Sequence, residues 1–291
     1  MKSLVTGSKG FIGSHLLEAL IKHGHTVSTL DRVANNSTHI NRSIQADILN
    51  RDAVRNAIAG QDLVFHMAAV LGTSELVDRA RDAVDVNIGG TINVLDACRA
   101  ENARLVFVSK PNPWLNTYSI TKHAAEQFCL MYRAEFQMPV TIVKPFNVYG
   151  PRESVGPGRP QKMIPTSVVK ALNNEPLTVF GTGEQVNDYI YIDDVVRLIC
   201  ELSMEENAIN GTYDIGTGMG QTVNDVCDLI MALTGSHSKV QRVPMRPGET
   251  TDNALRADLT TIKRVIPIGE FVSLQNGLYK TIEHYKSLAG D

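Results

Sequence analysis

Short apolar runs alternate with amphipathic segments through the first half of the chain. Six apolar runs have the length of buried strands, at residues 3–5, 26–30, 43–46, 63–66, 104–108 and 140–143. Four segments between them have the apolar spacing of helices, at residues 14–22, 52–59, 82–100 and 117–136. This alternation predicts an α/β fold, in which helices cover both faces of a parallel sheet.

The second half has a different texture, which begins near Gly150. Glycine and proline are frequent from 150 to 160, as is typical of a loop. Beyond it we expect strands at 177–180, 190–191 and 211–215, and helices at 164–172, 193–203 and 223–234. We therefore expect a first domain at residues 1–150 and a smaller lobe at 151–291, of which about residues 187–203 return to the first domain.

The first strand leads into a loop with three glycines, Gly7, Gly10 and Gly13, and a helix, a second strand and Asp31 follow. In a dinucleotide-binding turn the glycines permit the tight turn, the close approach of a pyrophosphate and the packing of helix on strand. The pyrophosphate lies on the free N–H groups of the helix N-terminus, and the acid accepts hydrogen bonds from ribose hydroxyls. The pattern predicts a dinucleotide cofactor, and a glycine-rich turn without a ligand is the alternative.

Composition narrows the classes of partner. A net charge of −3 provides neither a basic field for nucleic acid nor a polybasic patch for a membrane. The four cysteines are scattered without a CxxC pair, which indicates buried free thiols rather than a metal site. Because the first strand begins at once and no signal peptide is visible, we expect a cytoplasmic protein.

Tyr118 and Lys122 are four residues apart, so a helix places both side chains on one face. A free tyrosine has a pKa of about 10, too high for a base at neutral pH. A neighbouring ammonium and a bound nicotinamide cation favour the phenolate, which can take a proton from a substrate hydroxyl while a hydride leaves the same carbon. The alternative is a tyrosine and a lysine on a solvated helix face.

Motifs along nearly the whole chain resemble the extended short-chain dehydrogenase/reductases, in the group of NAD-dependent nucleotide-sugar epimerases and dehydratases. The matching segments are TGSKGFIG at 6–13, HMAA at 66–69, VN at 86–87, YSITK at 118–122, KPFNVYGPR at 144–152, LTVFGTGEQVNDYIYIDD at 177–194 and RPGE at 246–249. The resemblance implies a Rossmann-type doubly wound parallel sheet with a smaller α/β lobe that binds the substrate.

The resemblance also implies roles for individual residues. Tyr118 and Lys122 are the implied catalytic pair. The implied cofactor-binding residues are Gly7, Gly10, Phe11, Ile12, Gly13, Asp31, Arg32, Asp47, Ile48, Met67, Ala68, Ala69, Asn87, Tyr118, Lys122 and Phe146. The implied residues for a nucleoside diphosphate sugar are Asn147, Arg152, Asn187 and Arg246. A loop-capping amide is the alternative for Asn147, and a surface arginine is the alternative for Arg246.

The chain departs from the resemblance between the strand that ends at Val108 and Tyr118. Family members have a serine run there, with a hydroxyl placed on the reacting group, whereas this chain has Lys110 and Pro111 and a shorter loop. Ser109 is the nearest candidate for that catalytic role, and Thr117 is the second. Trp114 either stacks on the substrate or plugs the loop against the core.

Two further departures affect the ligands. Asn187 stands where an arginine often holds the diphosphate, and an amide cannot replace that fork of donors, so Lys144 or Arg152 would have to compensate. Asp31 favours NAD because its charge repels a 2′-phosphate, whereas Arg32 and Lys9 keep NADP possible.

Four functions follow. The first is an NAD-dependent nucleotide-sugar epimerase that acts at C4 through a 4-keto intermediate. A 4,6-dehydratase is less favoured, because Lys110 and Pro111 stand where relatives carry an Asp-Glu pair. A keto-sugar reductase would release oxidised cofactor. The fourth, of another class, is a catalytically inactive NAD(P)-binding regulator, which the broken serine run favours and the intact Tyr118 and Lys122 oppose. By resemblance we expect a homodimer built on helices 82–100 and 117–136.

Overall fold

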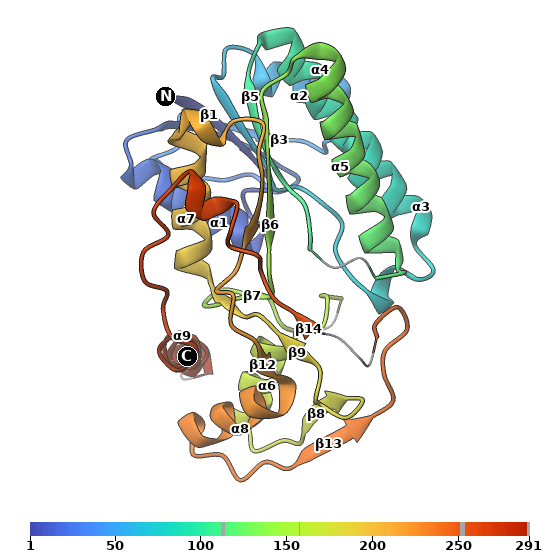
Figure 1. Cartoon of the computed structure of the whole chain (residues 1–291), viewed down its shortest axis with the longest axis vertical. Coiled ribbons are helices and arrows are strands. Elements are labelled where there is room, and N and C mark those ends of the chain that lie inside the picture. The colour runs from blue at the N-terminus through green and yellow to red at the C-terminus, as the bar shows by residue number, and fades with distance from the viewer. Residues whose placement is uncertain (112–113, 157, 251–253, 290–291) are drawn as a thin grey trace.

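Seven parallel strands form the central sheet, in the order β11-β6-β5-β4-β1-β2-β3 (Figure 1). The computed structural model describes residues 1–111, 114–156, 158–250 and 254–289. The strands are β1 (Lys2–Thr6), β2 (Thr26–Asp31), β3 (Arg42–Gln45), β4 (Leu63–His66), β5 (Arg104–Val108), β6 (Val140–Pro145) and β11 (Thr212–Ile215). The strand order reverses between β1 and β4, which is the point where doubly wound sheets bind their ligands. The predicted Rossmann-type sheet is confirmed.

Helices cover both faces of this sheet (Figure 1). On one face lie α2 (Arg51–Ile58), α3 (Ala80–Ala83), α4 (Thr91–Glu101) and α5 (Thr117–Phe136). On the other lie α1 (Phe11–Lys22) and α7 (Ile192–Met204), which pack against each other. No helix among the described residues has the length and apolar character needed to cross a membrane.

The smaller lobe is built from helices and short strand pairs below the sheet in Figure 1. Its helices are α6 (Met163–Leu172), α8 (Val223–Thr234) and α9 (Leu274–Ala289). Its strands are β7 (Val148–Tyr149) with β10 (Ile190–Tyr191), β8 (Leu177–Phe180) with β13 (Val240–Val243), and β9 (Val186–Asn187) with β12 (Gln221–Thr222) and β14 (Ala254–Leu255). From the second half of the chain, α7 packs against α1 and β11 is an edge strand of the main sheet.

Two hydrophobic clusters hold the layers together. One lies between the sheet and α2, α4 and α5 and includes Leu95 and Cys129. The other begins under α1 and α7 and continues into the smaller lobe, where it includes Val168, Ile230 and Leu278. The smaller lobe therefore shares its core with one face of the sheet. The four cysteines are buried free thiols, as the sequence indicated.

The segment expected as one helix over 82–100 contains a π-helix, η2, over Val84–Gly90. α3 precedes it and α4 follows it. The wider turn lets Asn87 point inward, where its side chain is buried and bonded on both sides. A single regular helix was the wrong prediction here, because sequence periodicity cannot reveal a π-turn, a feature frequent at functional sites.

The ends of β1 and β4 are joined by a chain of buried hydrogen bonds. Thr6 Oγ1 lies 2.7 Å from His66 Nδ1, and His66 Nε2 lies 3.1 Å from Thr91 Oγ1. Thr91 donates its own proton to the carbonyl of Asn87, so it accepts from His66, and the imidazole is neutral with its proton on Nε2. Burial lowers the pKa of His66 from 6.5 to about 3.

This buried histidine predicts a loss of stability in mild acid. The unfolded chain binds a proton at His66 below pH 6.5, whereas the folded chain does not until about pH 3. The contribution of the neutral His66 to the free energy of unfolding is therefore complete above pH 6.5 and is lost as the pH falls from 6.5 towards 3. Between pH 6.5 and 5 the free energy of unfolding should fall by about 1.5 kcal/mol more in the wild type than in His66→Asn. Urea unfolding of both proteins measures this difference, and equal falls would contradict it.

Candidate active site

The glycine turn is pressed against the end of β4. Gly7 has a φ of +69°, and a Cβ placed on it would lie 2.7 Å from the backbone nitrogen of Ala68. A Cβ on Gly13 would lie 2.2 Å from the carbonyl oxygen of Gly7. Both positions therefore exclude side chains. Met67, beside Ala68, donates its N–H to the carbonyl of Thr6, so this strand end and the turn share one backbone surface.

The N-terminus of α1 has no side-chain cap. Its N-cap residue is Gly10, and its first turn, which begins with Phe11 and Ile12, contains no acidic residue. By contrast, Asn50 caps α2 and Asn116 caps α5. The free N–H groups of α1 are therefore available to an anion.

Ser8 adds a second sign of a ligand at this turn. Its hydroxyl is buried and has no hydrogen-bond partner among the described residues. Buried polar groups are normally paired, so an unpaired hydroxyl beside uncapped N–H groups fits an oxygen-rich ligand such as a pyrophosphate.

Asp31 lies at the carboxyl end of β2 and forms a hydrogen bond to the backbone of the glycine turn. One of its oxygens accepts the N–H of Lys9 at 2.9 Å, and the other accepts the N–H of Val33 at 3.1 Å. A carboxylate has about four acceptor sites, so it retains capacity for ribose hydroxyls. Arg32 is exposed next to it.

The segment after β3 packs close to η2. Ile48 is buried, and a Cβ on Gly90 would lie 2.4 Å from its side chain. The carbonyl of Ile48 accepts a hydrogen bond from Asn93, and Asp47 caps its own turn by accepting the N–H of Leu49.

Asn87 connects the loop after β4 to α5. Its amide nitrogen donates to Thr121 Oγ1 at 3.0 Å and to the carbonyl of Val70, and its oxygen accepts the N–H of Val70 at 2.8 Å. Thr121 precedes Lys122. The loop that carries Ala69 and the helix that carries the tyrosine–lysine pair are therefore held by one amide.

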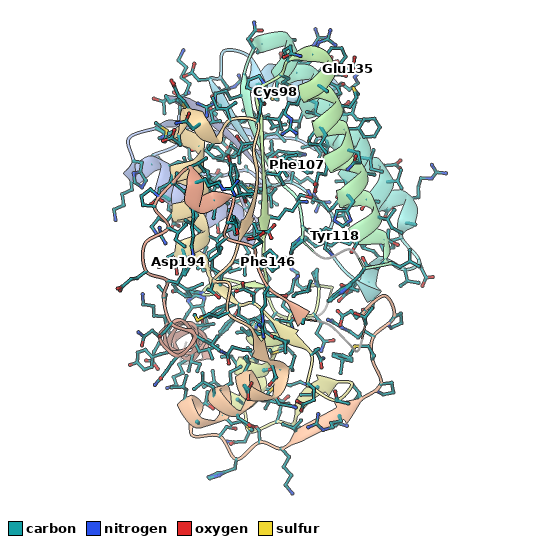
Figure 2. All side chains as sticks on the ribbon, viewed as in Figure 1. Cys98, Phe107, Tyr118, Glu135, Phe146 and Asp194 are labelled. Carbon is teal, nitrogen blue, oxygen red and sulfur yellow. The ribbon has the colours of Figure 1, made fainter. Side chains whose placement is uncertain are left out.

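Tyr118 and Lys122 lie in the first turns of α5, at the junction of the sheet and the smaller lobe. Figure 2 shows Tyr118 at the end of α5 nearest that junction, and Phe146 beyond the end of β6. Burial raises the pKa of Tyr118 and lowers that of Lys122 to about 8. The Lys122 ammonium lies 4.2 Å from the ring centre of Phe107. Burial thus disfavours the Tyr118 phenolate, and neighbouring cations are needed to lower the pKa of the phenol again.

Ser109 points to a different group from the expected one. Its hydroxyl donates to Glu126 Oε2 at 2.5 Å, and the other oxygen of Glu126 forms a 2.7 Å ion pair with Lys144. Its proton is donated to Glu126, so only the lone pairs of its oxygen remain for a reacting hydroxyl, and the catalytic role of Ser109 stays a prediction. Glu126 was missed by the sequence analysis, although its i, i+4 spacing from Lys122 places it on the same helix face.

The structure places Asn147 and Asn187 around one buried acid. The Asn147 amide donates to the carbonyl of Asp188, and the carboxylate of Asp188 accepts the N–H groups of Thr217, Gly218 and Ala257. Asn187 is buried beside it. Both asparagines therefore lie in the framework of the smaller lobe near Phe146, whose N–H bonds to β11.

The two expected arginines lie in separate places. Arg246 donates to the carbonyl of Gln161 and pairs with Glu249, while its buried Nε has no partner among the described residues. Arg152 forms a partly exposed ion pair with Glu18 of α1. The guanidinium of Arg152 is engaged there, and its role in substrate binding stays a prediction.

Comparison with known proteins identifies the family of the chain. The model of the NAD dependent epimerase/dehydratase family matches residues 3–110 and 109–216. A UDP-N-acetyl-alpha-D-glucosaminuronate decarboxylase from Bacillus cytotoxicus is 29% identical over 100% of this chain and 99% of its own.

Solved structures show the same fold. UDP-glucuronic acid 4-epimerase from Bacillus cereus, in complex with UDP-glucuronic acid and NAD, has a TM-score of 0.90 at 28% identity, with 99% of this chain and 100% of that chain covered. UDP-glucose 4-epimerase from Thermotoga maritima, with UDP-glucose, has a TM-score of 0.89 at 26% identity and the same coverage.

Gly10→Ala tests whether the glycine turn binds the cofactor. The added Cβ would lie 3.2 Å from the carbonyl oxygen of Gly7 and narrow the approach of a pyrophosphate, so the dissociation constant for NAD should rise by about tenfold or more. Gly89→Ala is the control, because a Cβ there meets nothing within 4 Å. Titration calorimetry measures the dissociation constant for NAD, and melting temperatures show whether each variant is folded. An unchanged affinity for NAD in a folded Gly10→Ala protein would refute the expectation.

Asp31→Asn tests the choice between NAD and NADP. The amide keeps the shape of the side chain and removes the charge that repels a 2′-phosphate, so the affinity for NADP relative to NAD should rise by about tenfold. The measurement is the ratio of the two dissociation constants. A ratio that does not move would assign cofactor choice to Arg32 or Lys9.

Proposed function

The chain belongs to the NAD dependent epimerase/dehydratase family, and from that premise we propose that it is a nucleotide-sugar epimerase that acts at C4 through a transient 4-keto intermediate. The observation that carries the proposal is the placement of Tyr118 and Lys122 four residues apart on α5, a helix that Asn87 bonds through Thr121 to the loop after β4. Two similar structures are 4-epimerases, which supports C4 as the reacting carbon.

The residues of the chain divide the work as follows. When bound, NAD would accept the hydride from the sugar and give it back. Tyr118 takes the proton of the C4 hydroxyl and returns it to the C4 oxygen once the keto sugar has presented its other face. Lys122, whose pKa of about 8 leaves it mostly protonated at pH 7, opposes the effect of burial on the Tyr118 phenol and holds the nicotinamide ribose.

Arg246 is the residue we propose for the nucleotide diphosphate. Its buried Nε has no partner in the described part of the chain and can donate to a ligand, and its guanidinium lies 4.8 Å from the ring centre of Phe180. Asn147 is proposed to contact the same ligand with its amide oxygen. The related proteins named above act on or bind acidic as well as neutral UDP-sugars, so both kinds belong in the test.

Tyr118→Phe should lower kcat by about a hundredfold or more while the affinity for NAD stays within about threefold, because only the proton-transferring oxygen is removed. Tyr132→Phe is the matched control, since Tyr132 lies on the same helix and donates its hydroxyl to Asp96. Full activity of Tyr118→Phe would contradict the mechanism, whereas unchanged cellular function of an inactive Tyr118→Phe protein would favour the regulator.

The reaction itself is tested with a panel of UDP-sugars and NAD, with products identified by NMR. We expect the C4 epimer of at least one sugar, without net reduction of NAD. A stable dehydrated or decarboxylated product would replace the epimerase proposal, and no product from any sugar would end it.

A further inference from the structure

Lys110 occupies the position of the broken serine run and reaches the active site. Its Nζ donates to Ser119 Oγ at 2.6 Å and lies 5.0 Å from the ring centre of Tyr118 and 5.6 Å from that of Trp114. Its carbonyl accepts a hydrogen bond from His123 of α5. The lysine is thus held on the helix that carries Tyr118, with only 9% of its surface exposed.

The Lys110 ammonium has no counter-ion in the part of the chain that the structure describes. The charged groups that act on it from other segments are Lys162, which repels it, and Glu249, which attracts it. Glu249 is already paired with Arg246. A buried cation is costly unless an anion or several acceptors compensate it, and an ammonium has three donors, of which Ser119 takes one.

Lys144 and Lys122 have other neighbours. Lys144 is neutralised by Glu126 at 2.7 Å, and Lys122 lies over the Phe107 ring and feels the Glu126 charge. Among the described residues, neither Lys122 nor Lys110 forms an ion pair, and because Lys122 is assigned to the nicotinamide ribose, Lys110 is the buried lysine left for another anion. Its two remaining donors and its charge fit a ligand with a carboxylate.

We propose that Lys110 binds a carboxylate on the sugar of the substrate, so that the preferred substrates are nucleoside diphosphate uronic acids. This inference rests on the proposed function, in which Tyr118 acts on the C4 hydroxyl. In a hexuronic acid the carboxylate is attached to C5, the carbon next to C4. A cation that lies against the Tyr118 ring is then on the side of the site where this carboxylate lies.

The same geometry predicts a pH effect. Burial lowers the pKa of Lys110 to about 7, so the free protein loses the ammonium as the pH rises above 7, whereas a bound carboxylate favours it. The preference for an acidic over a neutral sugar should therefore decline from pH 7 to pH 9. In Lys110→Arg, whose guanidinium stays charged, the preference should be constant over this range.

The test compares UDP-glucuronic acid with UDP-glucose, which differ only in the oxidation state of C6. Dissociation constants are measured by calorimetry on NAD-loaded Tyr118→Phe protein, which prevents turnover, with Lys110 intact or changed to Met. With Lys110 intact, we expect UDP-glucuronic acid to bind about tenfold or more tightly than UDP-glucose. Lys110→Met should remove that preference and leave UDP-glucose within about threefold, and melting temperatures confirm that the variant folds.

The outcomes separate this inference from the proposed function. Equal binding of the two sugars with Lys110 intact, or an equal loss of both in Lys110→Met, would overturn the carboxylate site and assign Lys110 to the reacting hydroxyl. If no sugar is turned over but the Lys110-dependent preference persists, the epimerase proposal fails and the carboxylate site stands. If epimerisation occurs and Lys110→Met does not alter the preference, the carboxylate site fails and the epimerase proposal stands.

Discussion

The close approach of the backbone at Gly7 to the backbone at Ala68 is the constraint on which the rest of the site depends. The strand order reverses between β1 and β4, so the ends of these two strands meet at the cofactor turn. No side chain fits between them, and Thr6 and His66 lock the two ends with a buried hydrogen bond. This contact sets where α1 begins, and its uncapped N-terminus is where a pyrophosphate can bind.

Tyr118 and Lys122 are positioned beside the glycine turn with the help of a π-helix, which sequence periodicity does not predict. The π-helix η2 directs Asn87 inward, and Asn87 holds both the loop after β4 and Thr121 of α5. The side chains of Tyr118 and Lys122 are therefore positioned by residues more than thirty positions away in the sequence. A local rearrangement at η2 would be felt at the tyrosine without any change in the tyrosine itself.

Charge is distributed unevenly around the junction of the two lobes. Arg246 with Glu249, and Lys144 with Glu126, are paired within the chain, and such pairs mainly fix geometry. Lys110 is held by a hydroxyl and two aromatic rings instead. Lys110 thus places a buried ammonium without an ion pair among the described residues at the position where the resemblance implied a hydroxyl, which is the basis of the proposed carboxylate site.

The sequence by itself determined the sheet, the glycine turn and the tyrosine–lysine pair, because each depends on local periodicity or on spacing within one element. The helix at Thr117–Phe136 and the strand at Leu63–His66 have the bounds that the sequence predicted. Only the tertiary structure decided that Ser109 serves Glu126, that Arg152 pairs with Glu18 and that Lys110 lies against Tyr118. The partner of a side chain depends on which elements pack beside it, and pairs separated by 17 and 134 positions leave no periodic signal in the chain.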